Sequence, residues 1–437
     1  MISQPSITTQ RICWLIWLYF FLLIFEGALR KWVLPQLSAP LLIVRDPILI
    51  AIYLLAIYKR LFPWNPFVLT LFFLAGASFG CSLFIENSSL GVSLYGLRTT
   101  FLHVPLIFIM SSTLDRSTIE AIGYWTLRLL IPISILMLLQ YMSPPSAWIN
   151  TIPGGTGFQI DAPGHRVRPP GPFSFITGVS EFFGLASAFL LLGILRLRLY
   201  PKTLLSFSLA ALILGCSVSI SRLTLSSVAI VIWAFCILAA LRPGLTSKLM
   251  AIAIAGSVMF LLFAQLQVVH QAMGTFEDRI TLASKFEGGF GGFIDRIFLI
   301  FAEPFFNIDQ IPLTGFGLGV GTNVGATLLI GKQIFLLSEG EWSRMVMEGG
   351  PILGFGMVFW RVFLFIYLLW NSLMLALKGY AEPLLFFSAS CTLLLFGQWG
   401  RPTTLGFTIF ITGLCYTSIQ FILREIHERE RHVAAIH

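Results

Sequence analysis

Residues 203–241 read TLLSFSLAALILGCSVSISRLTLSSVAIVIWAFCILAAL and contain a single charged side chain, Arg222. An α-helix needs roughly 20 apolar residues to cross the hydrocarbon core of a bilayer, and this stretch is long enough for two. Within a bilayer the backbone has to satisfy its own hydrogen bonds, which an α-helix does. The stretch therefore predicts two transmembrane helices joined by a very short turn.

Similar apolar runs recur along the whole chain. Of its 437 residues, 57% are hydrophobic and 11% are charged, which excludes a water-soluble fold. We therefore expect an all-α polytopic integral membrane protein, with residues 1–437 forming a single membrane domain. The first run leads into FEGALRK at 25–31 without a small-residue cleavage site, so we expect it to stay attached. We predict twelve spans, near 12–28, 40–58, 66–85, 94–112, 119–141, 173–195, 203–220, 223–241, 248–266, 345–371, 382–398 and 403–422.

Basic residues in short loops indicate the orientation, because such loops prefer the cytoplasm. An even number of spans puts both termini on one side, and the cationic tails and alternate loops assign that side to the cytoplasm. The two longest loops, 142–172 and 267–344, then face outward. In the second, we expect short amphipathic helices, including an interfacial one at 294–302. The net charge of +8 is interpreted as an insertion signal, and nothing predicts nucleic-acid binding.

Several common chemistries have no sequence support. The six cysteines all lie inside apolar spans, so we interpret them as small core residues. The glycine-rich stretches at 287–292 and 315–321 lack the Lys-Ser/Thr of a phosphate-binding loop, so we predict flexible loops there. No CxxC or HExxH pattern is present. We therefore expect neither a metal nor another cofactor.

Many cations on the predicted outer side run against the orientation rule. An ionisable group at membrane depth costs about 2.5–3.5 kcal/mol on insertion scales, so each is a candidate functional residue. For some, a structural role is favoured: Arg45-Asp46 as a self-neutralising pair, and Glu26 with Arg30 as a helix-end pair. Arg98 and His103 on the fourth span remain open between a core role and a functional one. The cations concerned are Arg30, Lys31, Arg45, Arg98, Arg166, Arg168, Arg222, Arg279, Arg296, Arg344 and Arg401.

The strongest candidate is the segment 165–173, HRVRPPGPF. Its prolines and glycine prevent a continuous helix, so a stiff turn presents Arg166 and Arg168 just before the sixth span. Arginine binds phosphate in a bidentate manner and keeps its charge at any physiological pH. This segment predicts an anion site.

Two further clusters lie at span ends. The tight hairpin at 219–222, SISR, would point Arg222 back into the bundle beside two hydroxyls, although an interfacial snorkelling arginine is the alternative. The third cluster, SEGEWSR at 338–344, puts Glu339 and Glu341 at a membrane edge. A carboxylate there can serve as a general base, and a solvated loop end is the alternative.

The order of these elements resembles the O-antigen ligase and O-antigen polymerase superfamily, bacterial inner-membrane glycosyltransferases of the GT-C type. RPPGPF at 168–173 matches an Arg-x-x-Gly-x-Phe-like element that opens a middle helix. Ser221-Arg222 matches a Ser-Arg at a later helix, and 267–344 matches a large periplasmic loop. The resemblance extends over roughly 160–355 and implies a GT-C-like bundle.

One departure bears on the mechanism. In the family, the loop ends in a histidine nine or ten residues before a Glu-x-Gly, and that histidine is the proposed base of the ligases. Here Glu348-Gly349-Gly350 has no such histidine upstream, and Glu339, followed by Glu341, stands nearest the position. This favours a polymerase-like member over a ligase. Of the two carboxylates, Glu341 is the preferred base because Trp342 beside it could form an apolar wall, and the alternative is that Glu341 pairs with Arg344 and caps a span.

The resemblance implies that a glycan moves from a polyprenyl diphosphate to an acceptor sugar hydroxyl, at the periplasmic face of the inner membrane and without metal. Arg168 and Arg222 would then bind the diphosphate, with Arg166, Arg279 and Arg98 as secondary contacts. The expected partners are the lipid-linked oligosaccharide, the acceptor glycan and membrane lipids. Proteins of polysaccharide export or chain-length control are further candidates. The alternatives are a ligase, which uses another acceptor, and a non-enzymatic flippase of lipid-linked oligosaccharide.

Overall fold

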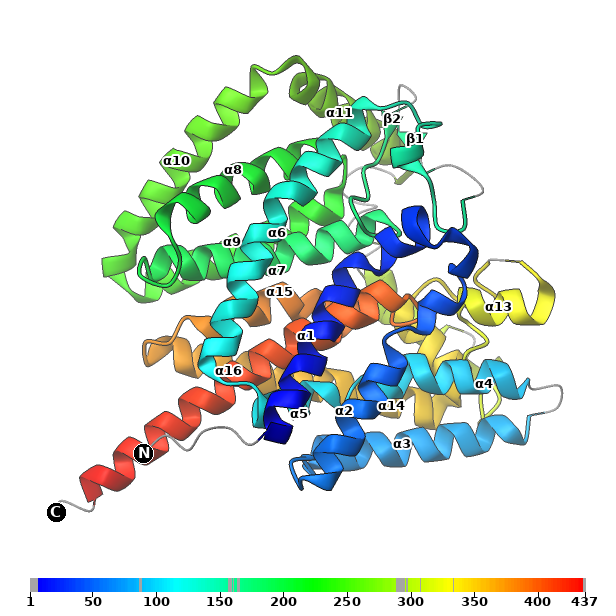
Figure 1. Cartoon of the computed structure of the whole chain (residues 1–437). Helices are drawn as coiled ribbons and strands as arrows, with labels where there is room; N and C mark the ends of the chain where they lie inside the picture. Colours follow the sequence, from blue (N-terminus) through cyan, green and yellow to red (C-terminus); the bar gives the residue numbers. More distant parts are fainter. Residues whose placement is uncertain are drawn as a thin grey trace.

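The computed structural model describes residues 7–85, 89–155, 159, 161–162, 166–287, 295, 298–306, 308–332 and 334–434. Helices dominate these residues (Figure 1). The α-helices are Ile7–Ala28 (α1), Asp46–Tyr58 (α2), Pro66–Leu83 (α3), Leu90–Leu97 (α4), Leu106–Thr113 (α5), Arg116–Met142 (α6), Ile176–Leu195 (α7), Lys202–Val218 (α8), Arg222–Leu241 (α9), Thr246–Ala264 (α10), Gln267–Glu287 (α11), Asn323–Ile330 (α13), Glu341–Leu377 (α14), Glu382–Phe396 (α15) and Pro402–Ala434 (α16). One short antiparallel pair of strands, Asp161–Ala162 (β1) and Arg166–Val167 (β2), precedes α7.

Within the part of the chain that the structure describes, ten helical segments are long and apolar enough to cross a membrane. Two shorter apolar helices, α8 and α15, accompany them. Every predicted span coincides with one of these segments. The prediction of an all-α polytopic membrane protein is therefore confirmed.

Burial separates central helices from peripheral ones. The most apolar stretch of α7 is 89% buried and that of α16 is 83% buried, whereas that of α10 is 0% buried. Helix α7 packs against α9, α6 and α15, and α16 packs against α5 and α15. Helix α10 lies at the edge of the bundle (Figure 1), with its apolar side chains directed to the surroundings.

Two spans are less regular than their apolar runs predict. The span at 94–112 is α4, a π-helical segment Arg98–Leu102 and α5 in succession, because Pro105 cannot donate the backbone hydrogen bond that a continuous helix needs. Helix α14 is kinked at Gly350, which has a non-helical φ of 73° and is followed in the sequence by Pro351. The kink at Gly350 brings backbone against the loop at 312–323, since a Cβ at Gly350 would lie 2.1 Å from the Leu313 carbonyl oxygen.

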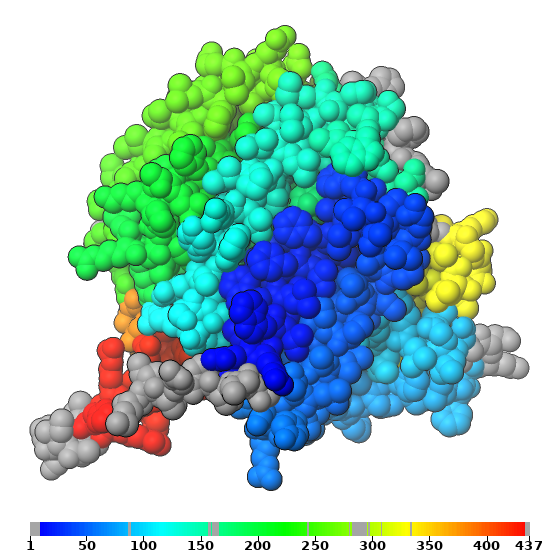
Figure 2. Space-filling view, in the orientation of Figure 1, coloured from blue at the N-terminus to red at the C-terminus, as the bar shows by residue number. Residues whose placement is uncertain are grey.

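The bundle has two chemically different ends. At one end, Arg116 of α6 lies 3.4 Å from Glu382 of α15 and 3.3 Å from Glu425 of α16, and Arg196 also pairs with Glu382. The opposite end carries the β1–β2 pair and α13, which projects from the surface beside α4 (Figures 1 and 2). This second end is the predicted outer one, and it contains the predicted arginine elements and the cluster around Glu339 and Glu341.

Candidate functional site

Helices α7 and α9 run parallel, and this brings two predicted arginine elements to the same end of the bundle. The Ser180 and Thr224 hydroxyls lie 2.8 Å apart, and one turn further on the Ser227 hydroxyl donates to the Ser180 carbonyl at 2.8 Å. The residues just before both helices therefore share one end. Arg168, in the segment leading into α7, and Arg222, the first residue of α9, are both partly exposed there.

The segment 169–173 is held rigidly from two sides. The Lys31 ammonium, which is buried, donates to the carbonyls of Gly171 and Phe173 at 2.7 and 2.8 Å. Gln140 accepts from the Gly171 N–H at 2.8 Å and donates back to its carbonyl at 3.2 Å. Gly171 has a φ of 58°, which a glycine adopts without strain. The predicted stiff turn is present, and a lysine and a glutamine within apolar helices are its supports.

Helix α1 also contacts this turn through its own backbone. A Cβ at Gly27 would lie 2.4 Å from the Ser174 nitrogen, so only glycine permits this approach. Nearby, Arg30 donates to the Ser174 hydroxyl at 3.1 Å. The segment EGALRK at 26–31 is thus a structural partner of the arginine element.

The second predicted arginine in this region has a different environment. Arg166 lies in β2, donates to Gln271 of α11 at 3.4 Å, and stacks over the ring of Tyr141 at 5.3 Å. His165, Arg296 and the side chain of Arg279 lie outside the described residues, as does part of the predicted interfacial helix at 294–302, of which 298–302 are helical.

The hairpin at 219–222 is tight and strained. Helix α8 ends at Val218, α9 begins at Arg222, and Ile220 between them has a φ of 48°, which a β-branched residue rarely adopts. The expected pair of hydroxyls is used by the backbone: Ser219 donates to the Cys216 carbonyl at 2.9 Å, and Ser221 caps α9 through the Thr224 N–H at 3.4 Å. Such strain commonly persists where it positions a functional group.

An apolar cavity begins beside this hairpin. It has a volume of about 890 Å³ and is lined mainly by α8, α9 and α10, with a contribution from α11. Ile220 and Leu225 line it next to Arg222, and Met273 and Phe276 line it from α11. Since α10 is otherwise unburied, this cavity has the dimensions and polarity to receive hydrocarbon.

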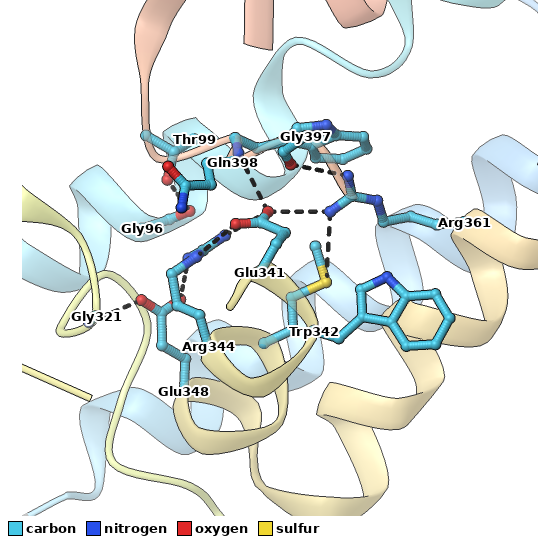
Figure 3. A network of polar contacts seen from close by, with 12 residues as sticks. Gly96, Thr99, Gly321, Glu341, Trp342, Arg344, Glu348, Arg361, Gly397 and Gln398 are labelled. Carbon is cyan, nitrogen blue, oxygen red and sulfur yellow. Dashed lines mark hydrogen bonds and ion pairs between the residues drawn. The ribbon is translucent and has the colours of Figure 1, made fainter. Parts of the chain in front are cut away.

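Glu341 lies in a buried ion network at the start of α14 (Figure 3). Its Oε1 accepts from Arg344 Nη2 at 2.9 Å, from Arg361 Nη1 at 3.0 Å and from the Trp399 backbone N–H at 3.2 Å, and its Oε2 accepts from Arg344 Nε at 3.0 Å. Glu341 thereby connects α14 to the loop between α15 and α16. The expected pairing with Arg344 is present, and Arg361, a fully buried arginine, is a partner that the sequence analysis missed.

Arg344 extends this network to the glycine-rich loop at 315–321. Its Nη1 donates to Glu348 Oε2 at 2.7 Å, and Glu348 Oε1 accepts from the Gly321 N–H at 2.9 Å (Figure 3). A Cβ at Gly315 would lie 2.3 Å from the Glu348 carbonyl oxygen, and one at Gly319 would lie 2.3 Å from that of Val92. The prediction of a flexible loop here is wrong, because these glycines permit close packing of backbone on backbone.

Glu339, two residues before Glu341, has a different environment. Its side chain is exposed, and its carboxylate makes no hydrogen bond or ion pair with any residue that the structure describes. It faces a small pocket with Asn323, Phe335 and Gln398, whose side-chain amide donates to the Glu339 carbonyl at 2.8 Å. Of the two candidate bases, Glu339 is therefore the accessible one.

Arg401, a candidate cation from the sequence that was given no role in the site, lines the same pocket. Its guanidinium lies 5.7 Å from the ring centroid of Phe175, directly before α7, and forms no hydrogen bond or ion pair with a described residue. Burial lowers the pKa of Arg401, and the carboxylates of Glu181, Glu339 and Glu341 oppose that shift. A guanidinium that forms no hydrogen bond or ion pair among the described residues is available to a ligand. The position of Arg401 before a proline-started span is the sequence signal.

The charges in the first spans pair differently from the prediction. Glu26 and Arg30 form the expected i,i+4 pair at 3.4 Å. Arg45 and Asp46, however, do not neutralise each other: Arg45 Nε lies 3.2 Å from Glu26, and Asp46 accepts from Arg98 Nε at 2.5 Å. The side chains of adjacent residues at a helix start point in different directions, so Arg45 and Asp46 pair with residues of different neighbouring segments. Because Arg98 is engaged by Asp46, it is not part of the accessible anion site.

His103 lies at the centre of this network. Its Nε2 is 3.2 Å from Asp46 and its Nδ1 is 3.1 Å from the Tyr19 hydroxyl, and the side chain is fully buried. Both ring nitrogens have partners, so the open question is resolved towards a satisfied core histidine.

Comparisons of this chain with protein-family models, with curated proteins and with solved structures find no match. The assignment of function therefore depends on the chemistry of the site and on the resemblance of its motifs.

Proposed function

We propose that this protein is a polymerase-type glycosyltransferase that transfers a glycan from a polyprenyl diphosphate to the hydroxyl of an acceptor sugar. The observation that carries the proposal is the gathering of Arg168, Arg222, Arg401 and Glu339 at one end of a membrane bundle, next to an apolar cavity. Such a reaction needs fixed cations for the leaving diphosphate, an accessible carboxylate for the acceptor, and a hydrophobic place for the lipid.

Arg168 and Arg222 are the proposed diphosphate ligands. Arginine forks match phosphate oxygens and hold a developing negative charge without reorganisation. The clamp by Lys31 and Gln140 and the strained turn at Ile220 both fix the backbone beside these arginines. Arg166 and Arg279 remain proposed secondary contacts, whereas Arg98 is omitted because Asp46 engages it.

The cavity between α8, α9 and α10 is the proposed site of the polyprenyl chain. Its lining is almost entirely apolar, and Ile220 at its end stands two residues from Arg222. A lipid whose chain lies there would present its diphosphate to the arginine elements. This requires no movement of charge into the hydrocarbon.

Glu339 is the proposed general base. Glu341 was the preferred candidate from the sequence, but both of its oxygens accept hydrogen bonds from guanidinium groups, so we assign it a structural role. In the proposed step the Glu339 carboxylate takes the proton of the acceptor hydroxyl, and the oxygen forms a bond to the anomeric carbon. The bond from that carbon to the diphosphate oxygen breaks, and its electron pair leaves with the diphosphate.

The proposal includes twelve membrane crossings in a GT-C-like bundle, with the site at the periplasmic face of a bacterial inner membrane. A glutamate at the position where related ligases carry histidine favours polymerase over ligase. Ser338 and Gln398 help to hold the Glu339 backbone in place, since Ser338 donates to Glu303 at 2.5 Å and Gln398 to the Glu339 carbonyl at 2.8 Å.

The test is to incubate the purified protein with lipid-linked repeat units in the absence of nucleotide and added metal. A ladder of longer lipid-linked glycans is the expected result. Transfer to a different acceptor would replace the proposal by a ligase, and lipid movement across vesicles without new bonds would replace it by a flippase.

A further inference from the structure

Helix α7 contains a carboxylate that the proposed mechanism does not use. Glu181 lies within the most buried span and is 3% exposed. Its Oε1 accepts from the Thr404 hydroxyl at 2.6 Å. Its Oε2 is buried and has no hydrogen-bond partner among the described residues.

A purely structural role explains this arrangement poorly. A glutamine would accept the same hydrogen bond from Thr404 without the cost of placing a carboxylate in an apolar environment. Buried carboxylates at membrane depth are therefore expected to have a cationic partner or a function.

The position of Thr404 indicates the partner. Arg401 directly precedes α16, and its carbonyl accepts the first helical hydrogen bond from the Leu405 N–H at 3.0 Å. Thr404 lies in the first turn of that helix. The Glu181 carboxylate, bound to Thr404, is therefore close to Arg401, and the two groups interact electrostatically. Arg45 is a second cation that interacts electrostatically with Glu181, but Arg45 is already paired with Glu26 at 3.2 Å. Arg401 is the nearby cation whose guanidinium has no described ion-pair partner.

We propose that Glu181 is a positioning residue for Arg401: its buried carboxylate supplies the counter-charge that holds the Arg401 guanidinium between Phe175 and the pocket of Glu339. The inference rests on the proposed function only in assigning Arg401 to the acceptor sugar, whose hydroxyls an arginine can donate to. The electrostatic link between the two residues is independent of any turnover.

Chemical modification of Arg401 in the purified full-length protein tests this link directly. Phenylglyoxal attacks the uncharged guanidine, so a nearby carboxylate slows the reaction by favouring the charged form. We expect Glu181→Gln to raise the modification rate of Arg401 by about threefold or more, which corresponds to half a pKa unit. The rate is followed by mass spectrometry of chymotryptic peptides, with Arg424 on the exposed end of the same helix as the internal reference.

The matched control is Glu382→Gln, which removes a carboxylate from the opposite end of the bundle and should leave Arg401 unchanged. If Glu181→Gln does not yield folded protein, Thr404→Val replaces it: this change frees Oε1 to approach Arg401 and should slow modification. An unchanged Arg401 rate in Glu181→Gln, or a faster rate in Thr404→Val, would overturn the proposal.

Where the transfer assay gives turnover, a second readout follows. Loss of a positioning charge should lower kcat for Glu181→Gln by about tenfold, with Glu181→Asp recovering part of it, while KM for the lipid-linked donor stays near the native value. Equal kinetics for the native protein and Glu181→Gln would contradict a positioning role. Failure of the transfer reaction itself would leave the modification result intact, so the two proposals fail separately.

Discussion

Replacing Glu341 by glutamine separates a structural carboxylate from a catalytic one. The glutamine keeps the shape and one acceptor oxygen but removes the negative charge between Arg344 and Arg361. Arg344 retains Glu348 at 2.7 Å. Arg361, which is fully buried, keeps uncharged partners: the carbonyls of Leu393, Leu394 and Gly397, the Met345 sulfur and the Trp399 ring. A buried arginine is thereby left without a counter-charge.

Removing one partner of a buried ion pair costs about 3–5 kcal/mol. Whole domains are stable by only about 5–15 kcal/mol, so we expect a midpoint of thermal unfolding lower by roughly 5 °C or more. The assay is size-exclusion chromatography of the detergent-solubilised protein after heating. Glu339→Gln, two residues away and exposed, should change the midpoint very little.

A double variant tests the explanation. Glu341→Gln combined with Arg361→Met removes the uncompensated charge along with its partner, and should recover most of the lost stability. If Glu341→Gln instead matches the native protein in stability but forms no polymer, the reasoning is refuted and Glu341 becomes the better candidate for the base.

Three other predictions follow from local geometry. Gly27→Ala should sharply reduce the amount of folded protein in the membrane, because the new Cβ would lie 2.4 Å from the Ser174 nitrogen. Gly76→Ala, whose methyl group would meet open space, should leave that amount unchanged. Immunoblotting of membranes compares the two variants. Lys31→Met should loosen the turn at 169–173 and speed trypsin cleavage after Arg166 about fivefold, since the lost hydrogen bonds stabilise the turn by about 1 kcal/mol. An unchanged cleavage rate would show that Lys31 does not stabilise the turn. In a cysteine-free background, Ser146→Cys should react with an impermeant thiol reagent added outside sealed cells and Arg198→Cys should not, and the reverse result would put the site in the cytoplasm.

The helices could be predicted well because apolar length is a property of local sequence. Each expected span coincides with an apolar helix. Of the six cysteines interpreted as small core residues, Cys415 is buried and the other five are half-buried. Span boundaries were less accurate where partner groups extend a helix. Helix α14 begins at Glu341 instead of near 345, because the Arg361 and Trp399 contacts stabilise its first turn.

The pairing of charges could not be predicted, because it depends on which helices become neighbours. Arg45 and Asp46 are adjacent in sequence yet bind different helices. Arg361 was missed although it is a charged residue inside a predicted apolar span, which is the sequence signal that could have found it. Glu181 was missed although it too is a charged residue inside a predicted span. The loop at 315–321 was misjudged because glycine supports both flexibility and close packing, and only the contact with Glu348 distinguishes them.

The most direct test of the central claim is the ratio of polyprenyl diphosphate released to glycosidic bonds formed when purified protein acts on lipid-linked repeat units. The proposed reaction predicts one diphosphate for each bond with the native protein, and essentially none with Arg168→Ala or Arg222→Ala at equal protein levels. Lysine at either position should recover little, because a point charge cannot reproduce the planar fork of arginine. Full polymer formation by both alanine variants, or movement of the lipid without release of diphosphate, would contradict it.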